Sequence, residues 1–151
     1  MVNHWDENLI WSKYHLSVAE RMFDEFSKSG NKRFLVGVIR ELAESVSNLV
    51  DAFLIREAVL GRFKVSKHPA RNLGVFSKKI GIKYLGEDLV KDLLKVFELA
   101  RARKKSPIEF SRDNKILFLI EGEYKILTGK SMGNLLDSTK IALSKFRISS
   151  D

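Results

Sequence analysis

Residues 35–60 read LVGVIRELAESVSNLVDAFLIREAVL, and this stretch decides the fold. Its apolar residues recur every three or four positions, which is the spacing of one face of an α-helix. The stripe consists of Leu35, Ile39, Leu42, Val46, Leu49, Phe53, Arg56 and Leu60. A stripe of this length predicts a long helix that packs along a neighbouring helix at a shallow crossing angle. We expect the helix to end near Gly61, because glycine favours the position that follows a helix.

The residues before this stretch predict the neighbouring helix. From Trp5 to Phe26, mostly apolar side chains again follow one helical stripe, and residues 27–31 then supply turn residues around Gly30. So short a turn predicts that the two helices form an antiparallel hairpin.

The remainder of the chain predicts three more helices and one hairpin. The first helix begins at Pro69 and is bounded by Gly81 and Gly86, the second runs from Glu87 to about Arg103, and the last begins near Ser131. Residues 115–128 fit either a β-hairpin around Gly122 or a helix, and their β-rich composition favours the hairpin. We therefore predict a mainly α fold with one domain over residues 1–151. It should be a four- to five-helix bundle with a small β-hairpin at 115–128.

The composition excludes several classes of protein. Of the 151 residues, 44% are hydrophobic and 30% are charged, which suits a folded domain rather than a disordered chain. No apolar run approaches the ~20 residues of a membrane-spanning helix, and the N-terminus lacks the pattern of a signal peptide, so we expect a cytoplasmic protein. With no cysteine and only three histidines, we expect no metal centre and no cofactor. The absence of both cysteine and glutamine is typical of proteins from hot environments.

Positive charge is concentrated in the middle of the chain. Residues 61–112 hold 14 of the 27 Lys and Arg residues but only five of the 19 acidic ones. A basic region of this kind attracts polyanions, above all nucleic acid, because binding releases counterions. The alternative is a lysine-rich surface that keeps the protein soluble without a polyanion partner.

The candidate nucleic-acid-binding residues lie in this region. They are Lys67, Arg71, Arg101, Arg103, Lys104, Lys105 and Arg112. The last five border the loop 106–111, which contains Phe110, and cations beside an aromatic side chain are typical of sites that bind single-stranded nucleic acid. The alternative is that the cations at 101–105 complement the dipole at the end of a helix.

Arg62 and His68 form a candidate catalytic pair for RNA cleavage. The histidine would move the proton of the 2′-hydroxyl, and the arginine would hold the phosphate as charge builds on it. The alternative is that His68, which precedes Pro69, is a structural residue at the start of a helix.

Four other features have structural interpretations that we favour. Gly129-Lys130-Ser131 ends like a phosphate-binding loop but lacks the earlier glycine, so it predicts a turn and a helix cap. Arg56 interrupts an apolar stripe, and we expect its head group to reach solvent. Glu41 and Glu44 have no histidine at metal-binding spacing and should be solvated. The aromatic residues near the N-terminus, which are Trp5, Trp11 and Tyr14, should form a dimer contact or cover the end of the bundle.

The segment from Trp11 to Phe23 (WSKYHLSVAERMF), followed by a long second helix, resembles the HEPN superfamily. The resemblance covers roughly residues 5–103. It implies a small helical bundle, usually dimeric, which in many members is a metal-independent RNase with an Arg-x(4–6)-His motif. In this sequence that motif would be Arg62 and His68. Phe63 stands where the family usually has a polar residue, and the motif follows the second helix rather than a later one, so the resemblance favours a non-catalytic member.

Three functions follow as predictions. The first is a non-catalytic binding module with RNA as its ligand. The second is a metal-independent endoribonuclease that uses Arg62 and His68. The third is an interaction subunit that pairs with a second copy of itself or with another protein.

Overall fold

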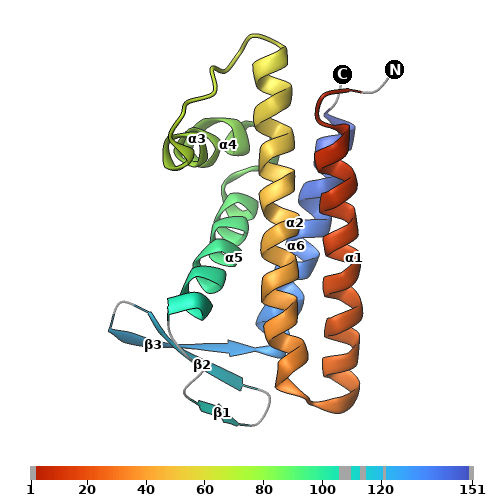
Figure 1. The fold of residues 1–151 in the computed structure, drawn as a ribbon, viewed down its shortest axis with the longest axis vertical. Helices are drawn as coiled ribbons and strands as arrows, with labels where there is room; N and C mark the ends of the chain where they lie inside the picture. Colours follow the sequence, from red (N-terminus) through yellow and green to blue (C-terminus); the bar gives the residue numbers. More distant parts are fainter. Residues whose placement is uncertain (1–2, 106–109, 113–114, 121, 150–151) are drawn as a thin grey trace.

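Two long antiparallel helices, α1 (Asp6–Ser29) and α2 (Lys32–Val59), form the scaffold of the fold (Figure 1). The structure is a computed structural model that describes residues 3–105, 110–112, 115–120 and 122–149. Gly30 adopts φ 68° between the two helices, and its N–H donates to the Phe26 carbonyl over 2.8 Å. Asn31 then caps α2 by accepting a hydrogen bond from the N–H of Arg33 at 3.0 Å. The predicted helical hairpin is confirmed.

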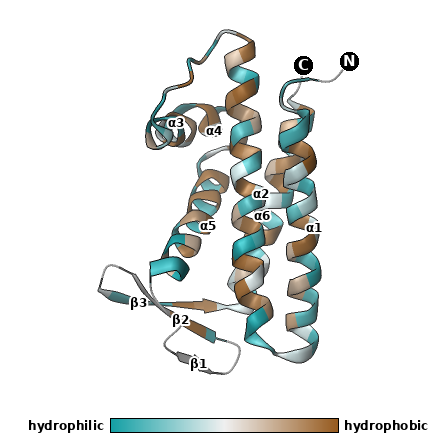
Figure 2. Ribbon diagram, viewed as in Figure 1, coloured by the Kyte–Doolittle hydropathy of each residue, from teal (hydrophilic) through white to brown (hydrophobic). Residues whose placement is uncertain are grey.

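Two further long helices complete the bundle. α5 (Glu87–Lys105) packs against α2 on the side away from α1, and α6 (Gly129–Ile148) runs along α1, α2 and α5 (Figure 1). Figure 2 shows hydrophobic and hydrophilic residues alternating along α2, as expected for a helix with a buried face. One core cluster connects the helices, and its fully buried members include Leu35, Leu42, Leu49, Phe53, Leu93 and Phe146.

The helix predicted from Pro69 is present and is built from three segments. It consists of α3 (Pro69–Val75), a π-helical turn η1 (Phe76–Ile80) and α4 (Gly81–Leu85). Gly81, one of the two glycines predicted to bound this helix, lies within it and allows close packing. A Cβ atom at Gly81 would lie 2.8 Å from a methyl group of Val90 and 3.1 Å from the ring of Phe76. The helix ends at Gly86, whose φ of 88° disfavours any other residue. With this segment the bundle has five helical parts, as predicted.

A small antiparallel sheet lies at the end of the bundle where α1 and α2 are joined, away from the two chain termini (Figure 1). The predicted hairpin is confirmed as β2 (Lys115–Ile120) and β3 (Glu123–Thr128), which turn around Gly122 at φ 81°. A third strand, which the sequence pattern does not predict, is β1 (Phe110–Arg112), and it pairs with β2. Ile116 and Leu127 are paired in register and both are buried, so the hairpin joins the helical core through this pair.

Within the described residues, no helix combines the length and the apolar character that crossing a bilayer requires.

Candidate nucleic-acid interface

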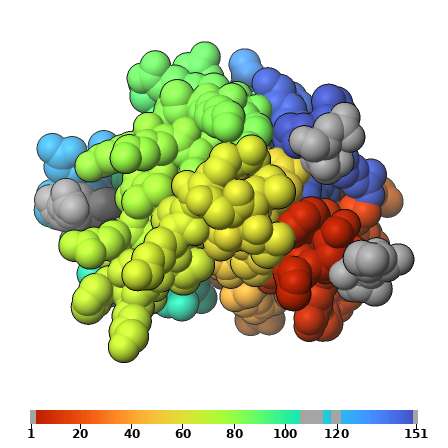
Figure 3. Space-filling view, turned by 90° about the horizontal axis from the view of Figure 1, so that it is seen from above, coloured from red at the N-terminus to blue at the C-terminus, as the bar shows by residue number. Residues whose placement is uncertain are grey.

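Residues 60–86 form a basic arm at one end of the bundle. The arm comprises the loop 60–68 and the helices α3, η1 and α4, and Figure 3 shows part of it extending from the body of the molecule. The sequence has no acidic residue between Glu57 and Glu87, while the arm holds seven Lys and Arg residues. Figure 1 places the arm and α5 on the same side of α2, opposite α1. The positive excess therefore lies on one side of the scaffold.

Local hydrogen bonds shape the loop of the arm. The side chain of Asn72 accepts from the backbone N–H of Ser66 at 2.8 Å and donates to the Ser66 carbonyl at 3.0 Å. His68 occupies the N-cap position of α3 without a capping hydrogen bond from its side chain. Its N–H donates to the Ser66 hydroxyl at 3.1 Å, and Pro69 occupies the first helical turn. These hydrogen bonds order a polar segment that has few apolar residues to bury.

A buried carboxylate attaches the arm to α2. The side chain of Glu57 accepts two hydrogen bonds from Arg62, at 2.7 and 3.3 Å, and one from the Tyr84 hydroxyl, and Arg62 also donates to that hydroxyl at 3.2 Å. Burial alone would raise the pKa of Glu57. The bonds from Arg62 and Tyr84, with the charges of Arg62 and Lys83, outweigh burial and lower the pKa. This Glu57–Arg62–Tyr84 cluster joins the end of α2 to the loop and to α4.

Six cations of the arm face solvent. They are Lys64, Lys67, Arg71, Lys78, Lys79 and Lys83. None of the six forms an ion pair with any carboxylate in the described part of the chain. Lys83 lies 5.0 Å from the centre of the Tyr84 ring, which is a cation–π distance. The other five are exposed charges that a polyanion could neutralise.

The predicted cationic cluster at the end of α5 is also exposed to solvent. Arg101, Arg103, Lys104 and Lys105 lie in the last two turns of α5 and face solvent. Arg112 lies on β1, paired in register with Lys115, and its side chain is outside the described part of the chain. Residues 106–109, which follow α5, are likewise outside it.

A groove connects the arm to this cluster. It lies between α2, α3 and α5 and has a volume of about 520 Å³. We call it the α2–α5 groove. Its floor is apolar and includes Val50, Leu54, Leu73 and Phe97. Its polar rim consists of Glu44, Ser47 and Asp51 from α2, Asn72 from α3, and Arg101 and Lys104 from α5. Two of the predicted binding residues, Arg101 and Lys104, therefore line the groove from α5. A third, Arg71, precedes Asn72, which lines the groove from α3.

The structure places the predicted catalytic pair in two different settings. The guanidinium of Arg62 is bound by Glu57 and Tyr84, and the hydrogen bond to Glu57 raises the pKa of Arg62. The side chain of His68 is exposed at the start of α3. In the described residues, no hydrogen bond joins Arg62 to His68. The geometry thus gives Arg62 a role in attaching the arm.

The prediction for Arg56 is wrong. Its side chain is 2% exposed rather than solvated. Its guanidinium lies 3.9 Å from the centre of the Phe146 ring and donates to the Phe146 carbonyl and the Ser149 hydroxyl, both at 2.9 Å. Desolvation lowers the pKa of Arg56. Arg56 therefore caps the C-terminal end of α6 from inside the bundle.

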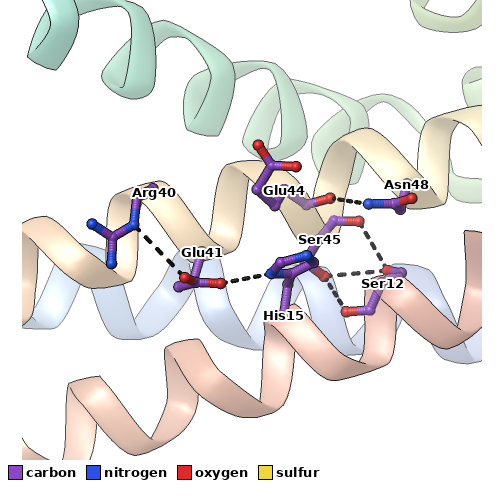
Figure 4. Close-up of polar contacts among 7 residues, drawn as sticks. All are labelled: Ser12, His15, Arg40, Glu41, Glu44, Ser45 and Asn48. Atoms are coloured by element: carbon purple, nitrogen blue, oxygen red, sulfur yellow. Dashed lines mark hydrogen bonds and ion pairs between the residues drawn. The ribbon is translucent and has the colours of Figure 1, made fainter.

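The prediction that Glu41 is solvated is also wrong. Glu41 and His15 form a largely buried pair between α1 and α2, with 2.6 Å between the carboxylate oxygen and Nδ1 (Figure 4). One turn away, Ser12 and Ser45 donate to each other's backbone carbonyls at 2.9 and 2.8 Å, and both are fully buried. Glu44 is exposed as predicted, and Figure 4 shows its carboxylate pointing away from the Glu41–His15 pair.

Two other predictions concern bound groups. The segment Gly129-Lys130-Ser131 forms the first turn of α6, and Thr128 and Ser131 form a reciprocal capping box, so the predicted helix cap is confirmed. Among the described residues, no three His, Asp or Glu side chains are grouped so that they could hold a metal ion.

Four of the arm's exposed cations are not among the candidates that the sequence suggested. These are Lys64, Lys78, Lys79 and Lys83. The signal that identifies them is the absence of any acidic residue from position 58 to position 86, which is visible in the sequence. The groove is also absent from the sequence-based predictions, because Glu44 and Asp51 carry no distinguishing pattern in the sequence.

Comparisons of the chain with protein-family models, with curated proteins and with solved structures found no match. The resemblance to the HEPN superfamily stays a prediction, and the function is inferred from the residues of this chain.

Proposed function

We propose that this chain is a non-catalytic, cytoplasmic module that binds nucleic acid, RNA above all, through the basic arm and the end of α5. The observation that carries the proposal is the set of six exposed arm cations that have no carboxylate partner among the described residues. Cations of a solubilising surface are usually interspersed with acidic residues, which neutralise their field. In the arm no acidic residue is interspersed with these cations along the chain, which favours a polyanion as partner.

The non-catalytic assignment follows from the setting of Arg62. Through Nε and Nη2 its guanidinium already binds the Tyr84 hydroxyl and Glu57, itself only 4% exposed, so a phosphate could use only the Nη1 donors unless it displaced Glu57. Leaving Glu57 buried without a partner would be unfavourable. Arg62 therefore supports the arm, and the exposed cations bind the phosphates.

The salt dependence of binding tests this function. We expect a fluorescent single-stranded RNA to bind the full chain at low salt, with log affinity falling linearly against log salt. In the variant Lys78→Gln/Lys79→Gln, the slope should fall by about 0.7 for each of the two lysines that neutralises a phosphate, and affinity at 0.1 M salt should fall about fivefold for each. Lys13→Gln/Lys145→Gln removes two exposed charges outside the arm and should change neither quantity. Absence of binding at low salt, or equal effects of the two variants, would overturn the proposal.

We also propose that α1 forms a contact with a second copy of this chain. Ile10, Trp11 and Tyr14 are 64%, 47% and 50% exposed on α1, and Trp11 and Tyr14 contact each other edge-to-face. Glu7 and Arg21 lie seven residues before and after Tyr14, so all three share one helical face. Neither Glu7 nor Arg21 has an ion-pair partner among the described residues. Two copies of α1 packed antiparallel about Tyr14 would bury the aromatic residues and bring each Glu7 opposite the Arg21 of the other copy.

A charge swap tests this contact. We expect a dimer at micromolar concentration by sedimentation equilibrium, and about tenfold weaker association in Glu7→Arg or Arg21→Glu, because each places like charges together. The double variant Glu7→Arg/Arg21→Glu should restore the dimer, since it restores both opposite pairs. A monomeric wild type, or a double variant as weak as the single ones, would contradict the antiparallel contact.

A further inference from the structure

The α2–α5 groove has an acidic wall on the basic side of the molecule. Glu44 and Asp51 are both exposed on α2, and neither side chain has a hydrogen-bond or ion-pair partner among the described residues. Arg101 and Lys104 lie on the opposite wall and are also unpaired in the described part of the chain. Surrounding protein atoms remove part of the hydration of Asp51, which raises its pKa. A carboxylate that loses water without gaining a donor favours a ligand that brings one.

The groove has the size and the floor of a small-ligand site. Its volume of about 520 Å³ lies within the range that binds small molecules, and its floor is made of Phe97, Leu54, Leu73 and Val50. Single-stranded RNA is commonly recognised by splayed bases that lie against aromatic and apolar side chains. A base of this kind would cover the floor, while the phosphate attached to it would remain near Arg101 and Lys104.

The acidic wall sets which base fits. Carboxylates accept hydrogen bonds from the exocyclic amino group of cytosine, and adenine and guanine carry amino groups as well. At ring position 4 uracil has a carbonyl oxygen where cytosine has its amino group, so a carboxylate that contacts this position meets an acceptor in uracil and a donor in cytosine. The phosphate backbone would be repelled by Glu44 and Asp51 but attracted by the opposite wall, which orients the nucleotide across the groove.

From this juxtaposition we infer that the α2–α5 groove holds one base of the bound strand and selects bases with an exocyclic amino group through Asp51. The inference rests on the proposed RNA binding and deepens it, since it names the class of base that is recognised. The arm supplies affinity that is independent of base identity, and the groove supplies the discrimination.

The sharpest test compares oligo(C) and oligo(U) RNAs of equal length, because the two pyrimidines have the same shape. We expect fluorescence anisotropy to show that the full chain binds oligo(C) about tenfold more tightly at fixed salt. Asp51→Asn adds a hydrogen-bond donor to the acidic wall and should abolish or reverse the preference for oligo(C). Glu44→Gln tests whether the second carboxylate of the wall contributes to the same preference. The matched control is Asp137→Asn on α6, which is exposed outside the groove and should leave the preference unchanged.

The outcomes separate this inference from the proposed function. Equal binding of oligo(C) and oligo(U) with a normal salt slope overturns the base site and leaves RNA binding intact. A preference for oligo(C) that survives Asp51→Asn also overturns it. Absence of binding to either RNA at low salt overturns the proposed function, and the base site with it.

Discussion

Replacing Arg56 with alanine is expected to lower the free energy of unfolding by about 3–5 kcal/mol. The substitution removes both donors from the end of α6, at the Phe146 carbonyl and the Ser149 hydroxyl. It also opens a void beside three aromatic rings, because the guanidinium lies within 5.3 Å of the ring centres of Phe53, Tyr84 and Phe146. The missing cap and the new cavity act together, so the effect should be among the largest of any single substitution in this chain.

Arg56→Met separates these two causes. Methionine fills most of the volume and has no charge to bury, but it removes the Arg56 donor from the Phe146 carbonyl, which keeps only the Ser149 hydroxyl at 3.2 Å. We expect it to cost about 1–2 kcal/mol, because the two hydrogen bonds from Arg56 to the end of α6 are lost while the packing is kept. Urea unfolding followed by circular dichroism measures all the variants. Arg40→Ala removes an exposed arginine from the same helix and should stay within about 0.5 kcal/mol of the wild type.

The ranking of these variants decides the role of Arg56. If Arg56→Ala were as stable as Arg40→Ala, the buried cap would contribute nothing. If Arg56→Met were as damaging as Arg56→Ala, the hydrogen bonds rather than the packing would account for the whole effect.

Arg56 also shows why the sequence predicts the backbone of this fold better than its interior. The hairpin of α1 and α2 depends on local signals, namely the helical stripe from Leu35 and the turn at Gly30, and these are read within a few residues. An arginine in such a stripe points inward or outward according to what surrounds it. Here the surrounding rings include Tyr84 and Phe146, which are distant in the chain. No local pattern around position 56 contains that information.

The same distinction applies to the candidate site. The basic arm is visible in the sequence, because its cations follow one another along the chain and no acidic residue intervenes. The α2–α5 groove is not visible, because its wall residues come from three elements and only packing brings them together. Gly81 is a similar case, since a glycine that ends a helix and a glycine that allows close packing look alike in one sequence.

Replacing Glu57 with glutamine is expected to cost about 2–3 kcal/mol at neutral pH and to loosen the basic arm. The buried carboxylate is the acceptor for both Arg62 and Tyr84, and its charge also acts on the buried Arg56. Glutamine keeps the shape but removes the charge, which takes a favourable electrostatic interaction away from the buried Arg56. Arg62 is half exposed and regains water, so the cost is smaller than for a fully buried pair. Hydrogen exchange should speed up over residues 60–86 more than in α1, because the cluster holds the arm to α2.

The pH dependence identifies the charge of Glu57 as the cause. Its pKa in the folded chain lies below the ordinary value of 4.5, so the unfolded chain binds the proton first as the pH falls. The stability that Glu57 provides is therefore fully present above pH 4.5 and is lost as the pH falls through the lower, folded pKa. The difference in unfolding free energy between wild type and Glu57→Gln should shrink as the pH falls below 4.5. The control Tyr84→Phe keeps the Glu57 carboxylate, so its unfolding free energy should retain most of the wild-type dependence on acid pH. A difference that stays constant from neutral to acid pH would mean that shape and hydrogen bonding, not charge, attach the arm to the bundle.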